Sequence, residues 1–270
     1  YLSGDPVTTD PFAQDLVFYQ VGGTETGLAA VHVVSPSLVF DAIALKQGVI
    51  AVPLVAVPPG VGVPLAGPDG GTVNGQNGTA LVVPPGALSE QTPLTLDTFE
   101  ASGLAGLLAP PGLTAVGALQ LGFEGTLQLP AALSIPQPAG LTDPSRALLV
   151  QVLEVGGRTR LVLRALARLS GGRLVSDVTL GGAPTALEGV RTPGRYLFLR
   201  SDTPLGFAAG LVRGTSNAPF TGALVSTTAF ATVSLSRGDG AYFAAAPSGP
   251  TTFVAADVVR ADRGVGAATL

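Results

Sequence analysis

The chain has 270 residues, of which 46% are hydrophobic and 12% charged, and it contains 37 glycines and 23 prolines. This composition is too apolar for a disordered chain, and it is typical of all-β proteins built from short strands and tight turns. A net charge of −4 without any basic run gives no support to nucleic-acid binding. The lack of cysteine excludes disulfides, thiolate metal sites and cysteine nucleophiles.

Residues 1–66 predict an N-terminal arm followed by part of a β-sandwich. The first 12 residues are polar and contain two prolines, which indicates an extended segment. Strands are predicted over residues 15–21, 28–34, 38–45 and 49–57, with glycine or proline between them. Because small isolated sheets are only marginally stable, we expect another sheet to cover the apolar face of these four strands.

One uncharged stretch, residues 49–68, is about long enough to cross a bilayer. Its prolines at positions 53, 58, 59 and 64 would break a spanning helix repeatedly, and lipid does not tolerate the freed backbone groups. We therefore interpret this stretch as a last strand followed by an extended linker, and we expect no membrane span in this chain.

The most specific pattern in the chain lies between residues 70 and 99. Asn74-Gly75 and Asn77-Gly78 predict a tight turn, because these residues tolerate positive φ. The strand expected at residues 80–83 must end at Pro84-Pro85, since two prolines remove two backbone donors. In the next strand, residues 94–97, two leucines alternate with threonine and aspartate and should share one buried face.

The ordered set Gly70-Gly71, Gly78 and Val83-Pro84-Pro85-Gly86-Ala87-Leu88 resembles the signature of the β-sandwich domain shared by ankyrins and netrin receptors. That domain also occurs in large bacterial surface proteins, and the resemblance implies a sandwich near residues 70–129. In animal relatives the following module can cleave itself at a His-Phe-Ser-type site. The single histidine here, His32, lies far upstream, so we do not carry this activity over.

Residues 67–203 are predicted to hold this sandwich and a following meander. Leu119, Leu121 and Phe123 alternate with polar or small residues, which indicates a strand paired in a hairpin with residues 127–129. The proline-rich stretch 130–144 is predicted to be a connection.

Further strands are predicted at residues 148–155, 158–169 and 173–180, each separated by a Gly-Gly turn. The middle segment has both helical and strand periodicity, because Arg160, Arg164 and Arg168 are four apart and also share even positions. The flanking turns favour a strand. Residues 189–198 resemble the strand that often closes this region in bacterial surface proteins.

Residues 204–270 resemble the carboxypeptidase regulatory-like β-sandwich, which is related in fold to transthyretin. The matching segments are residues 207–214, 219–225, 231–234, 238–242, 247–249 and 253–256. Such domains usually continue with further strands after the last of these segments, whereas this chain stops after residues 264–270. We therefore expect this module to be incomplete.

The last module lacks strands, and the front of the chain has extra ones. Residues 26–57 look like the terminal strands of the same kind of domain. Three explanations stay open: the chain is cut from a tandem array, its two ends pair within one molecule, or front strands complete the next copy in a head-to-tail filament. The candidate strand-exchange interface consists of apolar residues from both ends: Leu16, Phe18, Ile50, Val52, Leu54, Val254 and Val258.

Chemistry-bearing residues are scattered along the chain. The 18 carboxylates occur singly, beside turns or on strand faces expected to be exposed to solvent, and they form no calcium-loop pattern. The serines show no nucleophile-elbow pattern. A lone histidine cannot form a metal site. We therefore predict no catalytic, metal-binding or cofactor-binding residues.

Two short motifs have simple turn explanations. Arg237-Gly238-Asp239 is an integrin-type adhesive tripeptide at an expected hairpin tip, although Gly-Asp-Gly also forms turns. Asn77-Gly78-Thr79 matches the glycosylation sequon and likewise doubles as a turn.

Together these patterns predict an all-β fold of tandem β-sandwich (Ig-like/transthyretin-like) modules with extended linkers. We expect a non-enzymatic structural protein of the cell exterior, such as a unit of an adhesin, envelope protein or fibre. Its partners would be other copies of itself or neighbouring sandwich modules, with no nucleic acid and no cofactor. A carbohydrate- or protein-binding accessory module is the alternative, but 6% aromatics and no tryptophan disfavour sugar stacking. The absence of easily oxidised cysteine and methionine suits an extracellular location.

Overall fold

The computed structural model describes residues 64–99, 112–143, 146–214, 216–257 and 263–270, together with the backbone of residues 16–19 and 29–32. The chain divides into two compact units, Tyr1–Val61 and Gly62–Leu270. In the first unit, strand β1 (Leu16–Tyr19) pairs antiparallel with β2 (Ala29–His32). The strands predicted at residues 38–45 and 49–57 lie outside the described residues.

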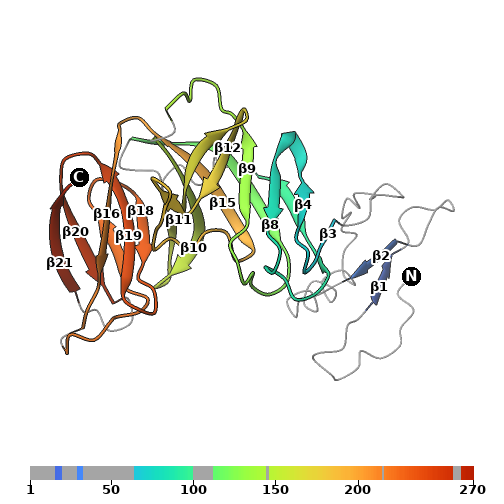
Figure 1. Cartoon of the computed structure of the whole chain (residues 1–270). Coiled ribbons are helices and arrows are strands. Elements are labelled where there is room, and N and C mark those ends of the chain that lie inside the picture. The colour runs from blue at the N-terminus through green and yellow to red at the C-terminus, as the bar shows by residue number, and fades with distance from the viewer. Residues whose placement is uncertain are drawn as a thin grey trace, which may run out of the picture. The chain divides into compact units, whose positions relative to one another are not determined.

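The second unit confirms the all-β prediction (Figure 1). Its described elements are strands, apart from a single 3₁₀ turn, η1 (Gln76–Gly78). Within the ranges that the structure describes, no helix has the length and apolar character that crossing a membrane requires.

One continuous sheet curls around the first hydrophobic core. Its strands follow the order β4-β5-β9-β12-β11-β10-β15-β8-β7. Their bounds are β4 (Gly71–Asn74), β5 (Ala80–Val83), β7 (Thr95–Thr98), β8 (Leu113–Gly122), β9 (Ala132–Pro136), β10 (Ala147–Val155), β11 (Arg158–Ser170), β12 (Arg173–Asp177) and β15 (Gly194–Ser201). β3 (Leu65–Ala66) and β6 (Thr92–Pro93) pair antiparallel in a separate, short two-stranded sheet. Leu81, Leu121, Leu149 and Phe198 are fully buried in the core that this sheet encloses.

The two ends of this curled sheet approach each other where β4 leads into its turn. A Cβ on Gly75 would lie 2.5 Å from the carbonyl oxygen of Leu96 in β7, so only glycine fits there without a shift. Of the two predicted turn pairs, Asn77 (φ 55°) and Gly78 (φ 72°) have the positive φ, whereas Gly75 has φ −99°. β5 ends immediately before Pro84, and Leu94 and Leu96 are both buried, as the sequence predicts.

The predicted partner strand at residues 127–129 is wrong, because β8 already pairs with β7 on one edge and β15 on the other. Those residues form a loop, in which the Leu127 amide donates to the Arg191 carbonyl and Leu129 is exposed. The predicted connection at 130–144 contains β9 instead, since Leu133 and Ile135 are buried between strands β5 and β12.

The ambiguous segment 158–169 is a strand, as predicted, but its side chains do not alternate evenly. In the register between β10 and β11, Leu149 faces Ala165 and Val150 faces Leu163, so Arg164 is an extra, bulged residue. A bulge reverses the faces on which the following residues lie. Leu161 and Leu163 therefore join one core, and Ala165 and Ala167 join the other.

The same sheet continues into the C-terminal part of the chain. It adds β18 (Thr232–Leu235), β17 (Leu224–Thr227), β20 (Pro250–Ala256) and β21 (Arg263–Thr269) in that order, through a short parallel pairing of Leu161 with Thr232 and Val162 with Val233. The loop before β15 carries a small hairpin, β13 (Thr179–Leu180) and β14 (Ala183–Pro184).

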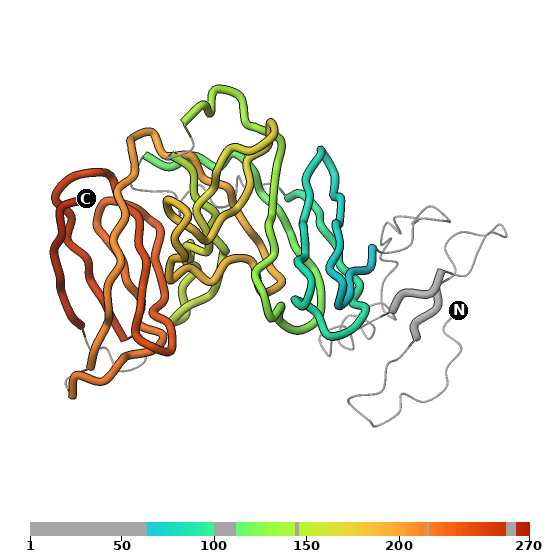
Figure 2. The backbone as a smooth tube through the Cα atoms, in the orientation of Figure 1, coloured from blue at the N-terminus to red at the C-terminus, as the bar shows by residue number. Residues whose placement is uncertain are grey.

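A two-stranded ribbon, β16 (Leu205–Leu211) and β19 (Ala241–Pro247), is packed on both faces (Figures 1 and 2). On one face Phe243 and Ala245 join Leu148, Val150 and Leu199 of the central strands. On the other, Ala244 packs with Val225 and Phe253. Strands buried on both faces are apolar throughout, which accounts for the alanine-rich sequence of β19. The C-terminal strands therefore share a core with the central strands β10, β11 and β15.

Candidate functional site

The adhesive tripeptide candidate lies in an exposed turn between β18 and β19. The turn is closed by hydrogen bonds from the Gly240 amide to the Arg237 carbonyl and from the Ala241 amide to the Asp239 carboxylate. The Arg237 amide also donates to the Ala241 carbonyl, and beyond this turn β18 pairs with β17 and β11 whereas β19 pairs with β16. The three residues thus connect two sheets, and the Asp239 side chain already takes part in the turn.

The residues predicted for strand exchange fall in three places. Leu16 and Phe18 lie in β1, of which the backbone is described. Ile50, Val52, Leu54 and Val258 lie outside the described residues. Val254 lies in β20, facing Ser226 of β17 on one side and Val265 of β21 on the other. Both edges of β20 are therefore paired, and the outermost strand of this sheet is β21.

The strand β21 is an addition to the predicted module, since the sequence comparison placed no strand after residues 253–256. It pairs with β20 along all seven residues, and each of those residues is exposed. No described strand pairs with its outer edge. β21 therefore offers a row of backbone donors and acceptors at the end of a long sheet.

The register of β21 identifies those outward groups. Both the N–H and the C=O of Leu270 bond to Gly249, at 3.0 and 2.9 Å. Doubly bonded pairs alternate with non-bonded pairs along an antiparallel ladder. Because the register shows no shift, the backbone of residues 263, 265, 267 and 269 points away from β20. Edge strands of soluble proteins are usually protected by proline, bulges or charge, whereas β21 has one charged residue, Arg263, at its start.

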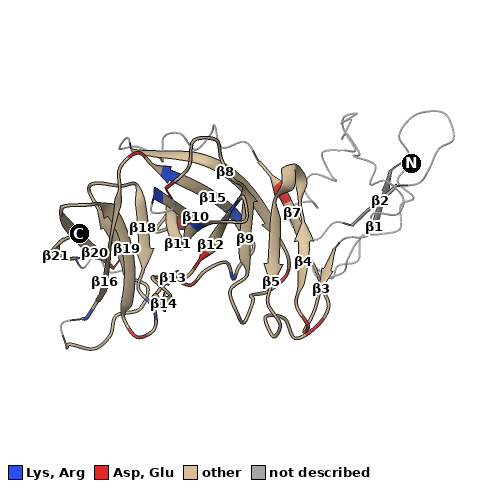
Figure 3. Cartoon of the chain, turned by 45° about the horizontal axis from the view of Figure 1, so that its top comes forward, with Lys and Arg blue, Asp and Glu red and all other residues tan. Residues whose placement is uncertain are grey.

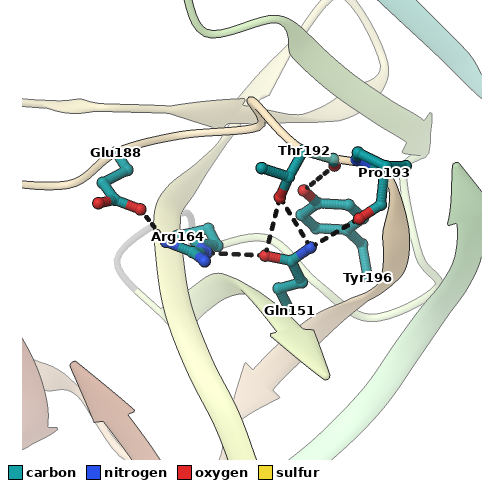
Figure 4. A network of polar contacts seen from close by, with 6 residues as sticks. All are labelled: Gln151, Arg164, Glu188, Thr192, Pro193 and Tyr196. Carbon is teal, nitrogen blue, oxygen red and sulfur yellow. Dashed lines mark hydrogen bonds and ion pairs between the residues drawn. The ribbon is translucent and has the colours of Figure 1, made fainter. Parts of the chain in front are cut away.

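A buried polar network lies at one end of the first core (Figure 4). The carboxamide oxygen of the fully buried Gln151 accepts a hydrogen bond from Arg164 Nε at 2.9 Å, and its nitrogen donates to Thr192 Oγ1 and to the Pro193 carbonyl, both at 3.0 Å. Arg164 also forms an ion pair with Glu188, which is about half exposed. The β-bulge turns Arg164 toward these partners, and the network ties the loop before β15 to strands β10 and β11.

Tyr196 completes this network. Its hydroxyl donates to the Thr192 carbonyl at 2.6 Å, four residues upstream and close to the start of β15. This bond ties the start of β15 to the chain segment immediately before it. Burial raises the pKa of the Tyr196 phenol, so it remains a neutral donor well into alkaline solution.

Replacing Tyr196 with phenylalanine should lower the free energy of unfolding by about 1–2 kcal/mol, since the part-buried Thr192 carbonyl would lose this donor. Urea unfolding would measure this change. The raised pKa adds a second expectation: the stability that depends on the protonated phenol is present below pH 10 and is lost as pH rises through the folded-state pKa. The variant should therefore lose less stability than wild type between neutral and strongly alkaline pH, and an equal loss would contradict this role.

A groove of about 370 Å³ lies between the η1 turn and β8, at a second bulge where Val116 has no partner on β15. Among the described residues that line it, none is charged. Charged residues are scattered over the described strands and loops (Figure 3). In the described parts of the chain, no three carboxylate or imidazole groups gather as they would in a metal site.

The sequence did not identify the network or the open edge. Arg164 gave a signal for the network, because it interrupts the apolar run 161–167 and a charge inside such a run needs a partner. Gln151 and Thr192 gave none. The glycine- and alanine-rich sequence of residues 263–269 shows neither the aromatic nor the β-branched enrichment typical of strands.

These observations define an all-β protein with a buried structural network and an exposed strand edge. No protein-family model matches the chain, and no curated protein shows significant sequence similarity to it.

Proposed function

We propose that this chain is a non-enzymatic structural protein of the cell exterior, whose copies assemble through sheet edges. In this proposal it is built from the two sandwich modules of Ig-like and transthyretin-like type indicated by the sequence, 67–203 and 204–270. The strand β11 and the parallel strand β18 join the modules, and the shared core around Phe243 makes the joint rigid. A rigid joint is useful in a fibre or envelope, where each unit must transmit force to the next.

The observation that carries the proposal is the outer edge of β21. A strand added there would meet the unpaired backbone groups of Arg263, Val265, Ala267 and Thr269, and its side chains would meet small neighbours. The proposed donor is the front part of another copy, with Leu16 and Phe18 on β1 among its apolar residues. A contact between the front of one copy and the back of the next does not close, so it propagates as a head-to-tail filament.

Replacing Ala267 with proline tests this assembly. The Ala267 amide points outward, so the substitution removes a donor from the open edge and leaves the ladder to β20 intact. We expect the variant to unfold like wild type but to form no head-to-tail polymers under conditions in which wild type forms them, as measured by size exclusion with light scattering. The matched control is Ala267→Val, which keeps the amide and should assemble like wild type. Assembly of the proline variant at the wild-type level would contradict the proposal.

A further inference from the structure

The end of β21 is anchored by one side chain. Leu270 packs against the cluster formed by Val225, Ala244 and Phe253 between the β16–β19 ribbon and the outer strands. The position opposite it in β16 is Gly206, where an added Cβ would lie 2.3 Å from the Cβ of Leu270. Gly206 therefore leaves a notch in the ribbon, and Leu270 fills it.

The rest of β21 contributes no buried side chain. All seven of its residues are exposed, and a Cβ added to Gly264 or Gly266 would touch nothing within 4 Å. Its attachment thus consists of the backbone ladder to β20 and the Leu270 anchor. Such a strand can leave its own sheet without exposing much apolar surface of its own, but its departure uncovers the edge of β20 and the Gly206 notch.

We propose that the β20 edge and the Gly206 notch form a docking site for β21 and Leu270 of a second copy, so that two copies exchange this strand. The occupant follows from the structure itself, because residues 263–270 already fill the site within one chain. The same residues from another copy would make the same contacts, which is the condition that makes domain swapping inexpensive. This inference is independent of the proposed function, which uses the opposite, outer edge of β21.

The wild-type chain contains no cysteine, so a designed pair reports the exchange without background. Thr252 and Ala267 face each other across β20 and β21 at a non-bonded position, where side chains lie closest, and both are exposed. The double variant Thr252→Cys/Ala267→Cys is prepared with and without ¹⁵N, mixed in equal amounts, unfolded, refolded at several concentrations and oxidised. Mass spectrometry of the linked peptides then separates linkage within one copy from linkage between copies.

We expect linked peptides that carry one labelled and one unlabelled partner, in a fraction that rises with protein concentration. Pairing at the outer edge of β21 cannot give this product, because it does not bring a second copy to Thr252. Same-label linkage alone at every concentration would overturn the proposal. Leu270→Ala removes the anchor from both arrangements alike, so the total yield of linked peptide should fall several-fold, and an unchanged yield would overturn the role of the notch. Circular dichroism of each variant before oxidation verifies that it is folded.

Discussion

Replacing Phe243 with alanine should destabilise the whole unit Gly62–Leu270, and not only its C-terminal strands. The ring is buried, lies 5.7 Å from the ring of Phe207 in a stacked arrangement, and packs in the core shared with β10 and β15. Truncating a buried phenylalanine typically costs about 3–5 kcal/mol, because transfer energy is lost and a cavity remains. We expect this loss in the free energy of unfolding.

Hydrogen exchange read by mass spectrometry shows which strands lose amide protection in this variant. If the core is shared, amides in β10 and β15 should lose protection together with those in β16 and β19. The control is Leu211→Ala in β16, where the side chain is 53% exposed and the change should stay within about 0.5 kcal/mol. Protection that falls only in strands β16 to β21 would show that the two halves unfold independently.

Replacing Arg164 with methionine should cost about 2–4 kcal/mol, although the new side chain is apolar and similar in length. The substitution leaves the buried Gln151 carboxamide oxygen without its 2.9 Å donor and removes the partner of Glu188. A buried acceptor left with only the 3.4 Å bond from Thr192 Oγ1 and a broken, partly buried ion pair are both costly, and the half exposure of Glu188 reduces the ionic part.

The same strand supplies the control for this substitution. Arg168 is 62% exposed and pairs with Asp177 at 2.8 Å, so Arg168→Met should cost less than about 1 kcal/mol. Chemical denaturation of both variants makes the comparison. Equal and small losses would mean that the buried network contributes little to the stability of the fold.

Local signals predicted the turns and strand ends well. The αL conformations at Asn77 and Gly78, the end of β5 before Pro84 and the burial of Leu94 and Leu96 all follow from interactions within a few residues. The long strand β11 was also predictable from its flanking Gly-Gly turns.

Features that depend on distant partners were not predictable. The bulge at Arg164 exists because Gln151 and Glu188 receive its side chain, and neither residue is near it in sequence. Strand β9 forms inside a proline-rich stretch because β5 and β12 offer it two edges. Likewise, β21 is a strand through its ladder to β20, since its own residues have weak strand propensity.

The central claim is that copies of this chain join at sheet edges. Sedimentation velocity of the wild-type protein over a wide concentration range, with negative-stain imaging of the same samples, tests it most directly. The account predicts species that grow with concentration and appear as elongated polymers, which the Ala267→Pro variant does not form. A wild-type protein that stays monomeric at the highest concentration would contradict it.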